Sequence, residues 1–264
     1  MARQDSNHPF VGRIDDLIYY KRNGKYFVRK AGSPSKEKIK TAPEFEKTRK
    51  LNKEFGGCAK AGHDLRKALS SLLPDHSDQD LTGRLVGLFS KVIKNGKGEC
   101  GSRMIEVVNN RAIIKNFQFK KKVSFDKVFS ERLQFSSSFK RKQVRLNINT
   151  FDPSVSFGKL NGITHFRLFL VIVAFSDFKF DKRSKTYKPV NTSVHEKHQV
   201  AFSDNISLAE KCIEVSISTM LPVKVALPDS IGVITIVGIE FCKEENGVMY
   251  AMPGRNCMKV GEVF

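Results

Sequence analysis

Residues 165–175 (HFRLFLVIVAF) and residues 231–241 (IGVITIVGIEF) are the two stretches of the chain that decide its fold. Nearly every position in both stretches is apolar, and Phe, Val and Ile dominate them. A strand covered on both faces has this composition, whereas a strand with one solvated face alternates between apolar and polar residues. The two stretches therefore predict central strands with protein packed on both sides.

Two other stretches show the alternation of half-buried strands. Their apolar positions are Val144, Leu146 and Ile148 in one stretch, and Ile213, Val215 and Ile217 in the other. No alternation of strands with helices follows residue 104, which disfavours a parallel sheet. We therefore expect an α+β fold in which residues 104–264 form an antiparallel β-sandwich of jelly-roll or immunoglobulin type.

Residues 41–97 carry the pattern of two helices. The first begins at the capping sequence Thr41-Ala-Pro-Glu44 and ends before Pro74, and the second follows the capping sequence Ser77-Asp-Gln-Asp80 and ends near Asn95-Gly96. We expect the two helices to form an antiparallel pair. The apolar stripe of the first helix consists of Leu51, Phe55, Cys58, Gly62, Leu65, Leu69 and Leu72. Several small residues in its middle predict either a close approach of another helix or strand or a kink in the helix.

Residues 11–30 (VGRIDDLIYYKRNGKYFVRK) predict a β-hairpin that turns at Asn23-Gly24. An isolated two-stranded hairpin is marginally stable in water, so it must pack on the main body or on another subunit. We treat residues 1–40 as an arm, with residues 31–40 as a polar linker. The candidate assembly residues are Ile14, Leu17, Tyr19, Tyr20, Tyr26 and Phe27.

The chain is strongly basic, with 46 Lys and Arg against 27 Asp and Glu, for a formal charge of +19. Residues 201–264 are the exception, because they hold eight acidic and five basic side chains. Basic clusters interleaved with Phe predict contact with a polyanion such as DNA or RNA, although lysines at a solvated strand edge would give the same pattern. The candidate nucleic-acid-binding residues are Lys21, Arg22, Lys25, Arg29, Lys120, Lys121, Lys122, Lys140, Arg141, Lys142 and Arg145.

The sequence carries no catalytic signature that we can identify. Five Cys without a CxxC pair disfavour a disulfide framework and a thiolate zinc site, and His195 and His198 are expected on opposite faces of a strand. No phosphate-binding glycine loop or nucleophile motif occurs. We therefore expect a protein that is not an enzyme, with no metal, no cofactor and no small-molecule substrate.

No apolar stretch approaches the roughly 20 residues of a membrane-spanning helix, and residues 1–10 lack the apolar core of a secretory signal. These features predict a cytoplasmic protein that does not insert into membranes.

The first hundred residues resemble an uncharacterised bacterial protein family. The resemblance is carried by residues 12–20 (GRIDDLIYY) with the Asn-Gly turn and Phe-Val-Arg29, and by three helix motifs, Phe45-Glu-Lys-Thr-Arg49, Glu54-Phe-Gly56 and Leu65-Arg-Lys-Ala-Leu69. Members of the family look cytoplasmic and β-rich after the helices. The resemblance implies no activity, cofactor or catalytic residue.

Two functions fit these observations. The preferred one is a structural protein that self-assembles into a filament, tube or shell, through contact of the basic front half of one copy with the acidic last quarter of the next. Nucleic acid would lie against the basic clusters. The alternative is a monomeric or dimeric accessory protein that binds DNA or RNA without sequence specificity.

Overall fold

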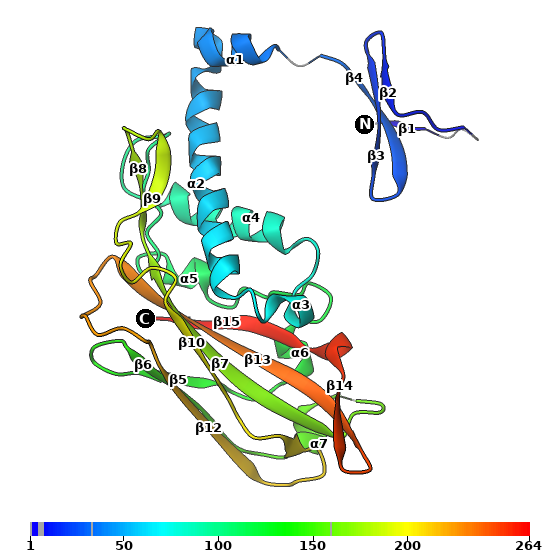
Figure 1. The fold of residues 1–264 in the computed structure, drawn as a ribbon, viewed down its shortest axis with the longest axis vertical. Helices are drawn as coiled ribbons and strands as arrows, with labels where there is room; N and C mark the ends of the chain where they lie inside the picture. The colour runs from blue at the N-terminus through cyan, green and yellow to red at the C-terminus, as the bar shows by residue number, and fades with distance from the viewer. Residues whose placement is uncertain (1, 5–7, 33, 159) are drawn as a thin grey trace. The chain divides into compact units, whose positions relative to one another are not determined.

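A computed structural model of the chain describes residues 2–4, 8–32, 34–158 and 160–264 (Figure 1). The chain divides into two compact units, Met1–Arg49 and Lys50–Phe264. Every pairing between strands within a sheet is antiparallel among the described residues, and helices accompany the sheets, so the fold is α+β as the sequence predicts. The expected helical segment belongs to the second unit from residue 50 onward, so three expected segments become two units.

The first unit is built around a four-stranded sheet with the order β1-β4-β3-β2, which is larger than the expected hairpin. Its strands are β1 (Ala2–Arg3), β2 (Gly12–Ile14), β3 (Leu17–Arg22) and β4 (Lys25–Lys30). The expected turn lies between β3 and β4, where Asn23 and Gly24 take φ angles of 49° and 77°. Both angles fall in the left-handed region that Asn and Gly tolerate best, which explains the choice of residues.

The linker is partly helical, unlike our expectation. Helix α1 (Lys36–Thr41) is capped by Ser35, whose Oγ accepts the Lys38 N–H at 3.1 Å, and a 3₁₀ turn η1 (Pro43–Phe45) follows it. Thr41 therefore ends a short helix instead of capping the long one, and its hydroxyl donates to the Glu37 carbonyl at 2.8 Å. The long helix α2 (Glu46–Ala68) begins at Glu46 and ends six residues before Pro74.

The second unit contains a six-stranded sheet in which the two predicted central strands, β7 (His165–Ser176) and β13 (Ile231–Glu245), are neighbours. They pair along twelve positions, from Ile231 opposite Ser176 to Cys242 opposite His165. Nearly all of their residues are buried, which confirms that both faces are covered. The remaining strands of this sheet are β10 (His198–Phe202), β11 (Ile206–Ser207), β14 (Val248–Ala251) and β15 (Cys257–Val263).

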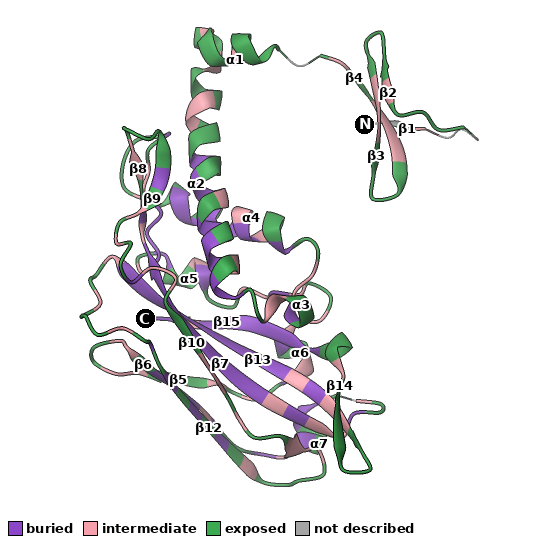
Figure 2. Cartoon of the chain, viewed as in Figure 1, coloured by how far each residue is buried: buried purple, intermediate pink, exposed green. Residues whose placement is uncertain are grey.

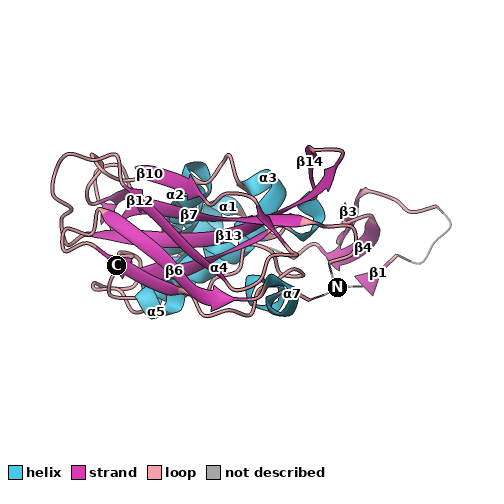
Figure 3. Ribbon diagram, turned by 90° about the horizontal axis from the view of Figure 1, so that it is seen from below, coloured by secondary structure: helices cyan, strands magenta, loops and turns pink. Residues whose placement is uncertain are grey.

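A three-stranded sheet with the order β12-β6-β5 covers one face of the central strands. Its strands are β5 (Gln134–Ser137), β6 (Gln143–Phe151) and β12 (Ile213–Met220). The predicted inward residues of β6 and β12 share one hydrophobic core with Leu168, Leu170 and Val237 of the central strands. The view from below in Figure 3 shows β6 and β12 in front of β7 and β13. A two-stranded hairpin, β8 (Phe178–Asp181) with β9 (Thr186–Pro189), extends from the end of β7.

Helices cover the opposite face of the central strands. Leu65 of α2 and Phe89 of α4 (Leu81–Lys94) share the second hydrophobic core with Phe175 of β7. In Figure 1, α4 crosses α2, so the expected antiparallel alignment of the pair is wrong. Asp80, not Ser77, precedes α4, and its side chain makes no capping bond. The short helices are α3 (Leu73–His76), α5 (Arg111–Ile114), α6 (Phe125–Val128), α7 (Pro153–Ser156) and the 3₁₀ turn η2 (Pro253–Arg255).

Two glycines in the middle of α2 show why small residues are needed there. A Cβ at Gly57 would lie 2.5 Å from the Tyr187 ring of β9, and a Cβ at Gly62 would lie 3.3 Å from Leu85 of α4. The close approach that the sequence predicts is therefore confirmed at both positions. Leu51 and Phe55, which we placed on the buried stripe, are exposed instead because the core begins only at Cys58.

Candidate assembly surface and nucleic-acid interface

The first unit buries none of its described side chains. Every described residue of Met1–Arg49 is intermediate or exposed, and Figure 2 shows no buried residue in β1 to β4. Ile14 and Leu17 keep 50% and 39% of their surface exposed. The described residues of this unit therefore form no buried core, and Ile14 and Leu17 are available to pack on another surface.

The strand register sorts the side chains of this sheet onto two faces, because residues paired across strands point to the same side. Tyr20 is opposite Phe27, and Phe27 is opposite Arg3. We define the basic face by the set Arg3, Arg13, Ile18, Tyr20, Arg22, Lys25, Phe27 and Arg29. The apolar face is defined by the set Ile14, Leu17, Tyr19, Lys21, Tyr26, Val28 and Lys30.

This sorting divides the predicted residues differently from our expectation. Four of the assembly candidates, Ile14, Leu17, Tyr19 and Tyr26, share the apolar face, whereas Tyr20 and Phe27 lie on the basic face. Among the cations, Lys21 lies on the apolar face with its Nζ 5.1 Å from the centroid of the Tyr26 ring. The other hairpin candidates, Arg22, Lys25 and Arg29, are exposed together on the basic face.

Three of the predicted cations in the second unit have structural roles. Lys120 donates to the Asp75 carbonyl at 2.7 Å, and burial lowers the pKa of its amine. The Arg141 guanidinium donates to the Ile231 carbonyl at 2.6 Å and to two further carbonyls, and Lys142 donates to the Lys224 carbonyl at 2.9 Å. These contacts hold loops together, so the three side chains are poor candidates for binding a polyanion.

The other four cations of the second unit, Lys121, Lys122, Lys140 and Arg145, are exposed. Lys121 and Lys122 line a surface hollow of about 420 Å³, but Asp78 and Asp80 line the same hollow and weaken its positive potential. The neighbouring rings of Phe119 and Phe125 are buried in the core and cannot stack on a base. The hollow at Lys121 and Lys122 therefore has cations but no aromatic ring in its lining, whereas Phe139 beside Lys140 is fully exposed.

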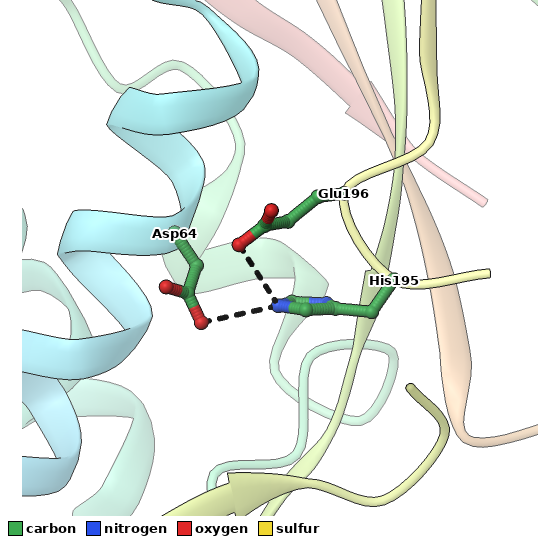
Figure 4. Close-up of side chains that lie close together, drawn as sticks. All are labelled: Asp64, His195 and Glu196. Carbon is green, nitrogen blue, oxygen red and sulfur yellow. Dashed lines mark hydrogen bonds and ion pairs between the residues drawn. The ribbon is translucent and has the colours of Figure 1, made fainter. Parts of the chain in front are cut away.

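Asp64, which is buried, and the partly buried His195 and Glu196 form a cluster between α2 and the loop before β10 (Figure 4). One ligand atom from each of the three lies within 4.8 Å of the others. The Asp64 carboxylate accepts hydrogen bonds from Lys60 at 2.6 Å and from His195 Nε2 at 3.2 Å. Burial raises the pKa of Asp64, but the hydrogen bonds from His195, Lys60 and His63 lower it more, so its pKa lies well below 3.8.

The hydrogen bonds of the His195 ring decide what this cluster can do. Its Nδ1 accepts the Ser176 backbone N–H at 3.1 Å, so Nε2 carries the ring proton and donates it to Asp64. A metal at Nε2 would need the proton on Nδ1, where it would face the Ser176 N–H. Lys60 and Lys67 already neutralise the two carboxylates, at 2.6 Å each. The cluster therefore links α2 to the loop before β10 through hydrogen bonds and ion pairs, and its nitrogen and oxygen atoms are not arranged to bind a metal.

Sequence spacing had drawn attention to His195 and His198 but missed Asp64. His198 is exposed, and its Nδ1 lies 2.8 Å from the Glu196 carbonyl instead of joining the cluster. Asp64 and His195 lie 131 positions apart in the chain, so only the packing of α2 on the sheet brings them together. A polar residue at a core position of the helical stripe, Asp64, was the available signal.

Two other carboxylates are held away from bulk water. Glu54 accepts from Arg103 at 2.9 and 2.5 Å and from the Gly101 N–H at 2.7 Å; burial raises its pKa, but these bonds lower it more, to a net value below 4.5. Asp177 accepts the Val107 N–H at 2.7 Å and lines a hollow of about 530 Å³. Burial raises the pKa of Asp177 from 3.8 to about 6.

Strand β14 is an exposed apolar edge. It pairs only with β13 among the described strands and ends the order of the six-stranded sheet. Val248, Met249 and Tyr250 keep 51%, 41% and 52% of their surface exposed. The paired part of β13 carries Lys243, Glu244 and Glu245; Lys243 forms a salt bridge with Glu245, and His165 Nε2 lies 3.5 Å from the Glu244 carboxylate. An edge of this composition is a typical place for another chain to dock.

Comparison of the chain with family models, curated proteins and solved structures gives no match. None of the helices in the described residues is long and apolar enough to cross a membrane. Functional inference therefore depends on the geometry of the chain itself.

Proposed function

We propose that this is a non-enzymatic structural protein that self-assembles into a filament, tube or shell. The observation that carries the proposal is the four-stranded sheet of Met1–Arg49, in which no described side chain is buried. In the proposed assembly, the apolar face packs on a neighbouring copy of the chain. Burying a side chain such as Leu17 there contributes about 1.5–3 kcal/mol, which offsets the lack of an internal core.

The proposed receptor on the neighbouring copy is the β14 edge. Val248, Met249 and Tyr250 offer exposed apolar surface, and Glu244 and Glu245 lie beside them. The apolar face presents Leu17 and Tyr19 flanked by Lys21 and Lys30, so the two surfaces match in polarity, and the lysines would face Glu244 beside Met249. Because the two surfaces are different, the contact runs head to tail, and a head-to-tail contact that does not close produces a filament.

The second unit would form the wall of the assembly. All members of its two hydrophobic cores lie between Cys58 and Val263, so it folds without the first unit. We infer that the two sheets sharing one core make a sandwich of jelly-roll or immunoglobulin type, and that assembly takes place in the cytoplasm. The remaining exposed lysines, Lys121, Lys122 and Lys140, would lie on a surface of the wall that faces nucleic acid.

Light scattering coupled to size-exclusion chromatography tests the proposal with two neighbouring residues of β3. Leu17 lies on the apolar face and Ile18 on the basic face of the same strand. We expect the unaltered chain to elute as a particle of many 29.8 kDa subunits, Leu17→Ser to reduce that mass, and Ile18→Ser to preserve it. Deletion of residues 1–34 should leave a folded monomer.

Two results would overturn the proposal. A full-length chain that stays at 29.8 kDa over a wide range of concentrations would mean that the apolar face packs on its own second unit. An assembly that survives the deletion would mean that subunits join through other surfaces. The first result would favour the alternative function, a monomeric accessory protein that binds nucleic acid.

A further inference from the structure

The basic face of the N-terminal sheet combines a pair of aromatic rings with five cationic side chains. Tyr20 and Phe27 lie side by side across β3 and β4, with ring centroids 5.8 Å apart and an interplanar angle of 27°. Cations flank this ring pair at both ends along the strands, and Arg3 lies beside Phe27 on β1. Arg22 and Lys25 lie opposite each other beyond it toward the turn, and Arg29 lies on the other side.

Within the described strands, no negative side chain offsets the positive charge of this face. None of the described residues of β1 to β4 is acidic, and the nearest acidic pair, Asp15 and Asp16, lies in the turn between β2 and β3. Four of the five cations are arginines, one on each of the four strands: Arg3, Arg13, Arg22 and Arg29. Such a constellation has a high local potential and presents planar donors that match phosphate oxygens.

A ligand for this face must supply both anionic groups and flat rings. Nucleic acid has both, because guanidinium groups bind its phosphates while aromatic side chains stack on its bases. The bases of a duplex are already stacked on one another and are reached only by their edges in the grooves. Rings lying on an open sheet can therefore stack only on the splayed bases of a single strand.

We propose that the basic face binds single-stranded DNA or RNA without sequence specificity. Tyr20 and Phe27 are the stacking platform, and Arg22, Lys25 and Arg29 contact the phosphates on either side of it. This site differs from the hollow near Lys121 and Lys122, which has cations but no accessible ring. The proposal uses the face opposite to the proposed assembly surface, so binding and assembly can be altered separately.

Two pairs of substitutions on the same strands provide a matched test. Arg22→Gln with Arg29→Gln removes two charges from the basic face, and Lys21→Gln with Lys30→Gln removes two charges from the apolar face. The binding of the full-length chain to a labelled single strand of about 16 nucleotides is measured by fluorescence anisotropy over a range of salt concentrations. Because Lys21 and Lys30 also flank the proposed assembly contact, light scattering records the assembly state of each variant, and affinities are compared at concentrations below those at which the unaltered chain assembles.

We expect the Arg22/Arg29 pair to weaken binding at least about tenfold. It should also reduce the slope of log affinity against log salt concentration by about 1.4, since each lost phosphate contact on a single strand contributes about 0.7 to that slope. The Lys21/Lys30 pair should change the affinity less than about twofold, because its charges point away from the ligand. Tyr20→Leu should weaken binding about tenfold by removing one stacking ring. A duplex of equal length should bind more weakly than the single strand.

Several outcomes would overturn the proposal. Equal losses for the two double variants would indicate general attraction to a +19 chain instead of a site on one face. An affinity that Tyr20→Leu leaves unchanged would rule out stacking of bases on Tyr20. Equal affinity for duplex and single strand would rule it out as well. If Leu17→Ser abolishes assembly while Arg22→Gln with Arg29→Gln abolishes binding alone, both proposals stand, and each can fail without the other.

Discussion

Replacing Asp177 by Asn should stabilise the protein at neutral pH. Asp177 follows β7 directly, and its Oδ1 accepts the Val107 N–H at 2.7 Å. Burial raises the pKa of this carboxyl from 3.8 to about 6, so the folded protein favours its neutral form. An Asn side chain is close to a neutral carboxyl in shape and keeps an oxygen that accepts the Val107 N–H. The substitution therefore removes the cost of the buried charge and preserves the hydrogen bond.

The magnitude follows from linkage between proton binding and folding. The pKa rises by about two units, and each unit corresponds to about 1.4 kcal/mol, for an upper value of about 3 kcal/mol. Asp177 is only partly buried, so solvent screening reduces the expected effect to about 1–3 kcal/mol. Because the pKa of Asp177 is raised, its contribution to stability is complete below pH 3.8 and is lost as the pH rises through about 6.

Urea unfolding at about pH 5 and about pH 8 measures this contribution. We expect Asp177→Asn to raise the free energy of unfolding at the higher pH and to raise it about half as much at about pH 5, where the carboxyl is ionised in the unfolded chain but still protonated in the folded one. Asp229→Asn is the matched control, because Asp229 lines the same hollow but is exposed. A destabilised Asp177→Asn variant at pH 8, or an equal gain from Asp229→Asn, would refute the reasoning.

Three further substitutions test the packing of the second unit. Gly238→Ala places a Cβ inside the ring of the fully buried Phe169, which should reduce the free energy of unfolding by about 1–3 kcal/mol, whereas Gly56→Ala on the exposed side of α2 should raise it by about 0.5–1 kcal/mol. An undiminished urea midpoint for Gly238→Ala would contradict the close contact. Glu54→Gln weakens the charged bonds to Arg103 and should reduce stability by about 1–3 kcal/mol at pH 7. Since the pKa of Glu54 is lowered, the loss of stability in Glu54→Gln should shrink as the pH falls below 4.5. A loss of stability that does not depend on pH would contradict a stabilising role for the Glu54 charge.

Periodicity was sufficient to predict the parts of the fold whose environment is set locally. The continuous apolar runs of β7 and β13 and the alternation around Leu146 predict their burial correctly, because a side chain's face depends only on its position in the strand. The same rule would have separated Tyr20 and Phe27 from Tyr19 and Tyr26, had it been applied to the hairpin.

Contacts between distant segments could not be predicted in this way. Asp64 meets His195 across 131 positions, and Arg141 reaches the Ile231 carbonyl across 90 positions. Both pairings depend on how the helices and loops pack on the sheet, which no local pattern encodes. The sequence therefore placed Arg141 among the nucleic-acid candidates, where the folded chain uses it to hold a loop.

Light scattering of the full-length chain during serial dilution tests the central claim most directly, with Leu17→Ser and Ile18→Ser measured in parallel. The account predicts a particle of many subunits whose mass falls on dilution, a much smaller mass for Leu17→Ser, and an unchanged mass for Ile18→Ser. A constant mass of 29.8 kDa for all three chains would contradict assembly through the N-terminal sheet.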